Sequence, residues 1–473
     1  MHVDWMVRKM ANMKMTKIPM AEQDPLVRNK NFLEVALGYT LEEAIDEANR
    51  CIECKHQPCK KGCPVNIKIP EFIKEVKEGN IKTAYDIITE DNGLPAICGR
   101  VCPQESQCES VCVRGIKGEP VGIGRLERFV ADWVMANEKQ EPPHIEPNGK
   151  KVAIVGSGPA SLSCASDLSR LGFEVVIFEA LHELGGVLMY GIPEFRLPKD
   201  LVKREIDLVL DLGVHVEKNV VIGKSLDIDD LFDDGYDAVF IGSGAGLPKF
   251  LNIPGENLNG VYSSNEFLTR VNLMKAYDFP NNHTPVKMGD SAIIVGGGNV
   301  AMDAARTAQR LGAKEVHVVY RRGMEELPAR KEEVHHAIEE GIIFDLLNNP
   351  LEIIGEDAKV TGMKVIQMEL GEPDASGRRR PVEIPGSEKV IDADTVIIAI
   401  GQTPNPLLTD ATPNLELNKW NCLQVNEETM ETTVPNVYAG GDAVTGAATV
   451  ILAMGAGKKA AKAIYNKLIL EKK

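Results

Sequence analysis

Long hydrophobic runs are absent from this chain of 473 residues, and no stretch approaches the length needed to cross a bilayer. Positive charge is also in short supply: 53 Lys and Arg face 69 Asp and Glu, which gives a formal net charge of −16. A chain this acidic is a poor match for nucleic acid. Met1 to Lys17 is rich in methionine and basic residues but lacks an apolar core, so we do not interpret it as a signal peptide.

Cysteine is missing from the long middle of the chain, because none occurs between Cys164 and Cys422. Eight of the ten cysteines lie in two short stretches near the start. These read Cys51-x2-Cys54-x4-Cys59-x3-Cys63-Pro64 and Cys98-x3-Cys102-Pro103, then Cys108-x3-Cys112. Cysteines gathered in metal-type spacings are typical of a reducing cytoplasm.

Thiols grouped in this way predict two iron–sulfur clusters. A proline directly after a grouped cysteine is typical of [4Fe–4S] proteins in which that cysteine binds the other cluster. Here the second spacing is four residues instead of two. Two zinc sites, with His56 nearby, are an alternative interpretation, and a disulfide framework is another. Cys164 and Cys422 stand alone and are interpreted as small buried apolar residues.

The first 137 residues predict a helical region that carries the grouped cysteines. Apolar side chains recur at helical spacing in Leu41–Arg50, in Ile69–Ile88 with a break near Gly79-Asn80, and in Gly124–Met135. The last segment places on one face Leu126, Phe129, Val130 and Val134. Residues 138–149 are polar and proline-rich, which predicts a linker.

Strands and helices alternate after this linker, and the pattern occurs twice. Lys151–Val155 opens the first unit and Ser291–Val295 the second, and each strand runs into a glycine-rich turn. Further strands are expected at Val175–Phe178, Asp237–Ile241, Glu315–Val319, Asp394–Ile400 and near Asn436. We therefore expect an α + α/β fold with two Rossmann-like domains, the second inserted in the first. The expected ranges are 1–137 for the helical iron–sulfur domain, 138–149 for the linker, 150–287 with 395–473 for the first dinucleotide domain, and 288–394 for the second.

The first glycine turn predicts a flavin site. It reads VAIVGSGPASL over 152–162, where Gly156 makes the tight turn and Gly158 lets the backbone approach a pyrophosphate. Glu179 ends the second strand, where its carboxylate can accept hydrogen bonds from ribose hydroxyls. Asp442, in a late turn, can bind a ribityl chain. The other residues expected to contact FAD are Pro159, Ala160, Gly185, Gly186, Gly244, Gly441 and Thr449.

The second glycine turn, AIIVGGGNVA over 292–301, predicts an NADPH site. The next strand ends in Arg321 and Arg322, where an NAD site would carry an acid. Two guanidinium groups suit a ribose 2′-phosphate, and Arg306 could assist them. The alternative is that Arg321 and Arg322 form only a solvated charge pair. The turn residues expected at this site are Gly296, Gly298, Asn299 and Val300.

Together these motifs resemble the small (β) subunit family of bacterial glutamate synthase. Its relatives include the FAD/NADPH subunit of NADH-dependent reduced-ferredoxin:NADP+ oxidoreductase, also described as the sulfide dehydrogenase α subunit, and the N-terminal part of dihydropyrimidine dehydrogenase. The resemblance covers nearly the whole chain. The motifs that carry it are PAICGRVCPQESQCESVC, IGRLERF, GSGPASL, GGGNVAMD, VVYRR and AGGDAVTGAATVILAMGAGKKAA.

The resemblance implies two [4Fe–4S] clusters with crossed ligation. It assigns to one cluster Cys51, Cys54, Cys59 and Cys112, and to the other Cys63, Cys102, Cys108 and Glu127. Glu127 falls where relatives have a ligand that is not cysteine, and Cys98 is then left over. The resemblance also places the segment Met189–Pro198 beside the flavin, where Arg196 could tune the charge of the flavin. The alternative is that Arg196 is a structural arginine. No catalytic proton donor is assigned.

Because the chain has no redox-active CxxC after Cys164, flavin electrons need another route, and the clusters offer one. We therefore predict a cytoplasmic, NADPH-linked flavo-iron–sulfur oxidoreductase that exchanges hydride between NADP(H) and FAD and passes single electrons to a partner. By resemblance the partner is a large glutamate synthase subunit or a small flavin/[2Fe–2S] subunit, with ferredoxin as a further candidate. The alternatives are sulfur or polysulfide reduction, a non-catalytic electron-transfer or assembly subunit, and a zinc-bearing NADPH-binding regulator.

Overall fold

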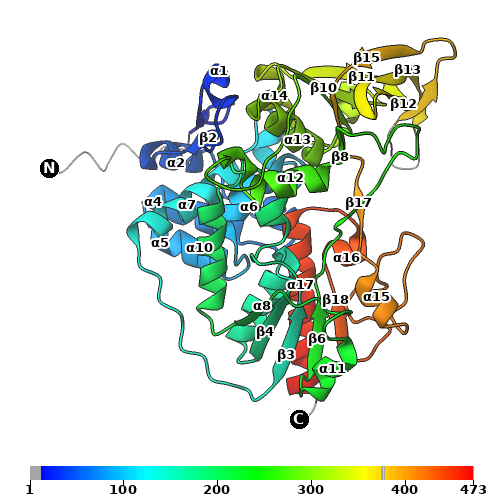
Figure 1. Ribbon diagram of the computed structural model, residues 1–473. Helices are drawn as coiled ribbons and strands as arrows, with labels where there is room; N and C mark the ends of the chain where they lie inside the picture. The colour runs from blue at the N-terminus through cyan, green and yellow to red at the C-terminus, as the bar shows by residue number, and fades with distance from the viewer. Residues whose placement is uncertain (1–11, 374–376, 378, 472–473) are drawn as a thin grey trace.

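The computed structural model describes residues 12–373, 377 and 379–471 and shows a helical part joined to two parallel sheets (Figure 1). Most of the Met1–Lys17 stretch therefore lies outside the described residues. None of the helices in the described ranges is long and apolar enough to span a bilayer. The predicted fold class, α + α/β, is confirmed.

The cysteine-bearing part is helical, as predicted. A capping box between Thr40 and Glu43 begins its first long helix, α2. Gly79 adopts a φ of 79° and ends α4 at the predicted break before α5. The predicted apolar face of α7 is buried. The elements of this part are β1 (Ala21–Glu22), α1 (Pro25–Arg28), β2 (Ala36–Gly38), α2 (Leu41–Ala48), α3 (Pro58–Lys61), α4 (Ile69–Glu78), α5 (Ile81–Thr89), α6 (Pro95–Val101) and α7 (Ile123–Asn137). Residues 138–149 form no helix or strand.

The first parallel sheet has the strand order β18-β6-β3-β4-β5. Its central strands are buried along nearly their whole length, as in a parallel sheet covered on both faces. Helices α8 and α17 pack closely, because a Cβ at Gly457 of α17 would lie 2.1 Å from the carbonyl oxygen of Ala160. The elements are β3 (Lys151–Val155), α8 (Pro159–Arg170), β4 (Glu174–Glu179), α9 (Val187–Tyr190), α10 (Lys199–Leu210), β5 (His215–Lys218), α11 (Ile228–Asp233), β6 (Ala238–Ile241), β18 (Val437–Ala439), α16 (Asp442–Thr445) and α17 (Val450–Tyr465).

The second parallel sheet has the order β11-β10-β9-β16-β8 and corrects two predicted domain boundaries. Strands β8 and β16 fall in ranges predicted for the first dinucleotide domain, yet β16 pairs with β8 on one side and β9 on the other. All four residues of β16 are buried, which suits the interior of this sheet. The elements are β8 (Val261–Ser263), α12 (Ser264–Asn272), β9 (Ser291–Val295), α13 (Asn299–Arg310), β10 (Glu315–Tyr320), α14 (Lys331–Glu339), β11 (Ile343–Leu346) and β16 (Thr395–Ile398).

An antiparallel sheet that the sequence analysis did not predict extends the second unit. Its elements are β12 (Asn348–Glu356), β13 (Lys359–Pro373), β14 (Arg379–Glu383) and β15 (Lys389–Asp392). A two-stranded link between the units and a short helix complete the chain: β7 (Leu247–Pro248), β17 (Gln402–Thr403) and α15 (Leu407–Ala411).

Buried ion pairs fix the second unit against the rest of the molecule. Arg28 in α1 donates to Glu339 at 2.6 Å and to Glu340 at 2.9 Å, at the end of α14. Figure 1 shows α1 reaching toward α14. Arg306 and Arg310 of α13 donate to the same Glu340 carboxylate, at 2.8 and 2.7 Å.

Candidate functional site

One large groove crosses both parallel sheets at the carboxyl ends of their strands. Both glycine turns open onto it, so the structure brings the two predicted nucleotide sites together. From the first unit, the predicted residues that line it are Gly156, Gly158, Pro159, Ala160, Glu179, Gly186, Arg196, Gly244, Gly441, Asp442 and Thr449. From the second unit they are Gly296, Gly298, Asn299, Val300, Arg321 and Arg322.

The glycine turns leave room for phosphate groups. Gly158 precedes α8 and Gly298 precedes α13, and no atom lies within 4 Å of the position that a Cβ would take at either residue. Gly156 has a φ of 88°, and a Cβ there would lie 2.8 Å from the carbonyl oxygen of Gly242. The exposed amides at the start of each helix attract anions. These features fit two dinucleotides, one at each turn.

Two carboxylates of the first unit are held at the groove. Glu179 is buried and accepts hydrogen bonds from the amides of Ser157 at 2.9 Å and Leu181 at 2.8 Å. Asp442 accepts from the amide of Ala448 at 3.1 Å, and burial raises its pKa above the usual range. Thr449 caps α17 beside them. Both carboxylates keep free lone pairs, which can accept from hydroxyl groups of a bound nucleotide.

Two predicted contacts do not reach the groove. The amide of Gly185 donates to Ser157 Oγ at 3.0 Å and so supports the turn from behind. Arg306 is fully buried, and its guanidinium is held by Glu333 and Glu340. The expectation that Arg306 assists NADPH binding is therefore wrong, because two carboxylates already satisfy its charge.

The other arginines have distinct settings. Arg321 is exposed at the groove, whereas Arg322 is buried and donates through Nε to the carbonyl oxygen of Arg379 at 2.9 Å. Arg196 lines the groove, but its Nη1 donates to both carboxylate oxygens of Asp303, at 2.7 and 2.8 Å. The Arg196 Nε lies 3.1 Å from Glu333. Two carboxylates of the second unit therefore balance the charge of this arginine of the first unit.

Sequence reasoning missed Lys199, which directly follows the segment Met189–Pro198. Its Nζ is buried and donates to the carbonyl oxygens of Leu188 at 3.0 Å, Leu197 at 2.9 Å and Ile192. Burial lowers the pKa of Lys199 to about 7. The sequence did not indicate that Lys199, the first residue of α10, would bind three carbonyl groups. These groups come together only when residues 188–197 fold around the lysine.

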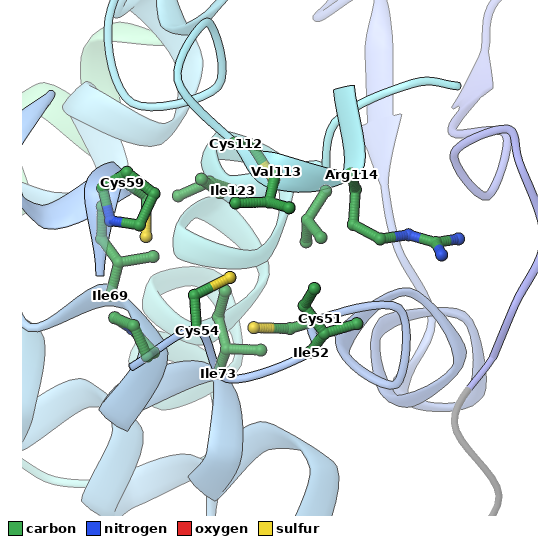
Figure 2. Close-up of a pocket in the computed structure, with 13 residues that line it drawn as sticks. Cys51, Ile52, Cys54, Cys59, Ile69, Ile73, Cys112, Val113, Arg114 and Ile123 are labelled. Carbon is green, nitrogen blue, oxygen red and sulfur yellow. The ribbon is translucent and has the colours of Figure 1, made fainter. Parts of the chain in front are cut away.

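Four cysteines line one cavity in the helical part, which we call the outer thiol site: Cys51, Cys54, Cys59 and Cys112. Figure 2 shows the sulfur atoms of Cys51 and Cys54 directed into the space between their own segment and the segment that carries Cys112. The wall behind them is apolar and includes Ile69, Ile73 and Ile123. These four thiols are the set that the resemblance assigns to one cluster.

The remaining candidate ligands form the inner thiol site, which is buried: Cys63, Cys102, Cys108 and Glu127. Burial raises the pKa of Cys63 to about 11, with further contributions from Glu127 and Cys102 nearby. The Glu127 carboxylate accepts from Asn92 Nδ2 at 2.7 Å, and burial raises its pKa to about 8. Three thiols and one carboxylate in a buried site can hold a metal cluster.

The inner thiol site adjoins the groove, whereas none of the described residues found to line the groove is an outer-site cysteine. Val101 and Pro103, which flank Cys102, both line the groove, so the inner thiol site lies directly beside it. The four cysteines of the outer thiol site are all partly exposed.

Two family models match the chain. One, described as dihydropyrimidine dehydrogenase domain II, 4Fe-4S cluster, matches residues 28–139, and one described as pyridine nucleotide-disulphide oxidoreductase matches residues 150–458. The glutamate synthase [NADPH] small chain of Halomonas elongata is 37% identical over 462 residues, covering 95% of this chain and 97% of its own. This chain belongs to the glutamate synthase small-chain family.

The matched family models decide how the grouped cysteines are interpreted. Because the matched N-terminal model is one of 4Fe-4S clusters, zinc and disulfide interpretations of the cysteines are set aside. The chain carries [4Fe–4S] clusters, FAD and NADP(H), and it is an NADPH-dependent flavo-iron–sulfur oxidoreductase.

Two further similarities extend the comparison, one in sequence and one in fold. An oxidoreductase named AegA from Escherichia coli is 38% identical over 447 residues, which are 93% of this chain and 68% of AegA. The solved structure of Mycobacterium tuberculosis FprA in complex with NADPH has a TM-score of 0.58 at 22% identity, covering 69% of this chain and 86% of FprA. Because the matched region is only 68% of AegA, a sequence similar to this chain also occurs as part of a longer protein.

Proposed function

We propose that this chain carries electrons between NADP(H) in the groove and a partner protein that docks at the outer thiol site. The observation that carries the proposal is the order of the three sites, from the groove to the inner thiols beside Cys102 and on to the partly exposed outer thiols. A flavin held at the first turn would supply the exchange between hydride and single electrons, and clusters held by the thiols would supply one-electron transfer.

In this proposal the first glycine turn holds FAD and the second holds NADP(H). Gly158 and Gly298 admit the pyrophosphates, and Glu179 and Asp442 accept from flavin-side hydroxyls. Arg321 binds the 2′-phosphate. The two thiol sites each hold a cluster, with Glu127 as the one carboxylate ligand.

Helix α17 links the groove to the inner thiol site in this arrangement. Its first residues line the groove, and one turn later Met454 contacts Cys98, whose Sγ lies 3.5 Å from the Met454 Sδ. A Cβ at Gly455 would lie 3.4 Å from the carbonyl oxygen of Pro64, next to Cys63. The buried, close-packed side of α17 would exclude water between a flavin in the groove and a cluster at the inner thiol site.

The outer thiol site has an apolar rim. Ile52 and Val113 line its cavity and are 47% and 38% exposed, and Ile116 on the same short turn as Val113 is 78% exposed. Exposed apolar groups around a redox site are typical of a docking surface. The rim therefore supports the outer site as the point of exchange with a partner.

Exposed lysines lie next to this rim in a chain whose net charge is −16. Lys55, Lys61 and Lys117 are exposed next to the outer cysteine segments, and none forms an ion pair with another described residue. Complementary charge steers association. We therefore infer that the partner presents an acidic face around its own redox centre, whether it is a large glutamate synthase subunit, a small flavin/[2Fe–2S] subunit or a ferredoxin.

Anaerobic native purification followed by mass identification of a stoichiometric partner tests the proposal. The double variant K55E/K61E should lose the partner in a salt-dependent manner, while NADPH-dependent reduction of ferricyanide at the flavin stays unchanged. K224E is the matched control, because Lys224 is an exposed lysine on the first dinucleotide unit. Equal partner retention by all three proteins would refute docking at the outer thiol site.

A further inference from the structure

Arg330 directly precedes α14 as its N-cap residue, and its backbone is bonded to the second glycine turn. Its backbone amide donates to Oδ1 of Asn299 at 2.9 Å, and the amide of the preceding Ala329 donates to the carbonyl oxygen of Gly297 at 3.2 Å. Asn299 and Gly297 both line the groove. The backbone that carries Arg330 is therefore fixed to the turn on which a dinucleotide would lie.

The side chain of Arg330 reaches the cysteine loop of the helical part. Its Nη1 donates to the carbonyl oxygen of Arg100 at 2.8 Å, and its Nη2 donates to Oε1 of Gln104 at 3.0 Å. Cys102 lies between these two acceptors in the chain.

Gln104 is hydrogen-bonded to the backbone beside two cysteines of the inner thiol site, Cys102 and Cys108. Its backbone amide donates to the carbonyl oxygen of Cys102 at 2.9 Å, and its own carbonyl oxygen accepts from the amide of Glu109, next to Cys108, at 3.0 Å. Its side-chain amide also donates to Gly99 at 3.3 Å. A shift of the Arg330 guanidinium would therefore move the loop that carries Cys102 and Cys108.

The Arg330 guanidinium is buried, and one of its N–H groups lacks a hydrogen-bond acceptor among the described residues. Nε has no hydrogen-bond partner among the described residues, and the nearest carboxylate oxygen to it, on Glu105, is 3.6 Å away. Nη2 also donates to Glu332 at 2.9 Å. Glu332 and Glu105 offset part of this charge. The positive potential that remains at the Cys102 loop favours the reduced form of a cluster there, because reduction adds negative charge.

We propose that Arg330 is a positioning residue that couples occupancy of the second dinucleotide site to the reduction potential of the inner cluster. This inference rests on the assignments of these two sites under the proposed function. A dinucleotide that orders the glycine turn would hold Arg330 against Arg100 and Gln104, and so raise the potential of the inner cluster. By linkage, reduction of that cluster would tighten dinucleotide binding by the same factor.

The test is a potentiometric titration of the holoprotein, monitored by electron paramagnetic resonance, with and without 2′-phospho-ADP-ribose as a redox-inert part of NADP+. In the wild type this compound should raise the potential of the inner cluster and leave that of the outer cluster unchanged. R330Q should lower the inner potential and abolish the shift. R330K keeps the charge, so it should keep the potential near that of the wild type and show a smaller shift.

R28Q is the matched control, because Arg28 is also a buried arginine bonded to α14 but lies away from the cysteine loop. Hydrogen exchange of residues 100–109 gives a second readout: the compound should protect them in the wild type and R28Q but not in R330Q. A wild type that binds the compound without a potential shift, or an R330Q variant that retains the shift, overturns the inference. Failure of the wild type to bind the compound, or the absence of a second cluster signal, overturns the proposed function instead.

Discussion

The Sδ atom of Met454 lies 3.5 Å from the Sγ atom of Cys98. Met454 belongs to α17, the helix whose first turn lines the nucleotide groove, and Cys98 is fully buried four residues before Cys102. The Cys98 thiol also faces the Asn92 side chain, at 3.7 Å from Oδ1. Cys98 is thus packed between the groove helix and the inner thiol site.

We expect E127A to alter the resonance signal of one cluster and leave the other unchanged, because only the inner thiol site contains this carboxylate. C98S is the control, since Cys98 packs against Met454, and it should retain the iron content and both signals of the wild type. Iron analysis and low-temperature electron paramagnetic resonance would measure both. Loss of a cluster in C98S with no change in E127A would reverse the ligand assignment.

Gly158 and Gly298, the two turn glycines with free space at the Cβ position, can be tested by the same substitution. G158A should lose FAD and keep dinucleotide binding at the second turn, whereas G298A should keep FAD and weaken NADP+ binding. Both residues have ordinary backbone angles, with φ of −71° and −91°, so the added methyl group acts by filling phosphate space rather than by strain. Flavin absorbance and calorimetric titration with NADP+ separate the two effects. Identical losses in both variants would contradict separate sites.

Replacement of Arg321 by alanine should reduce the preference for NADPH over NADH. A hydrogen bond to a charged group contributes about 1.5–3 kcal/mol, so the KM for NADPH should rise roughly 10- to 100-fold while that for NADH changes little. Steady-state ferricyanide reduction with each coenzyme would measure this ratio. R380A is a suitable control on an exposed arginine of β14, and an equal change in both variants would argue against a 2′-phosphate contact.

Acid should weaken the network around Glu340. Burial alone would raise the pKa of this group, but hydrogen bonds and charge from Arg310 and Arg306 outweigh it and hold the pKa at about 2, below the ordinary value of 4.5. Because the folded-state pKa is depressed, the stabilisation is complete above the unfolded value and is lost as the pH falls toward the folded one. The contribution that disappears is about 3 kcal/mol.

E340Q should therefore melt well below the wild type at neutral pH, and this difference should shrink as the pH falls below about 4.5. Thermal melting followed by circular dichroism at several pH values would measure it. E325Q, at an exposed glutamate before α14, is the control and should melt with the wild type throughout. A difference that stays constant with pH would contradict the pairing of Glu340 with the arginines.

The local pattern of the sequence was sufficient to place the central strands of both parallel sheets and the long helices of the cysteine-bearing part. Lys151–Val155 and Ser291–Val295 match β3 and β9 residue for residue, because each apolar strand ends at a glycine turn. The boundary between the two units was wrong because β8 has only three residues, too few for a periodic signal. Its membership of the second sheet depends on pairing with β16, more than 100 residues away.

Side-chain roles were harder to predict than elements. Helical spacing gives the angular position of Arg306 on α13, but the carboxylates that hold it lie 27 and 34 residues later, in and after α14. The turn residues Gly158 and Gly298 were predictable, since their role depends on local backbone chemistry. The grouping of the cysteines came from resemblance, because spacing alone does not show which segments meet.

The two cysteine segments are interlaced. Cys63 comes from the first segment yet lies at the inner thiol site with Cys102, and Cys112 comes from the second yet lines the outer thiol site with Cys51. Neither site is complete until both segments have folded together. Under the proposed ligand assignment, insertion of one cluster would bring the last ligand of the other into place. We therefore expect the two centres to be acquired together, so that half-loaded protein is a short-lived species.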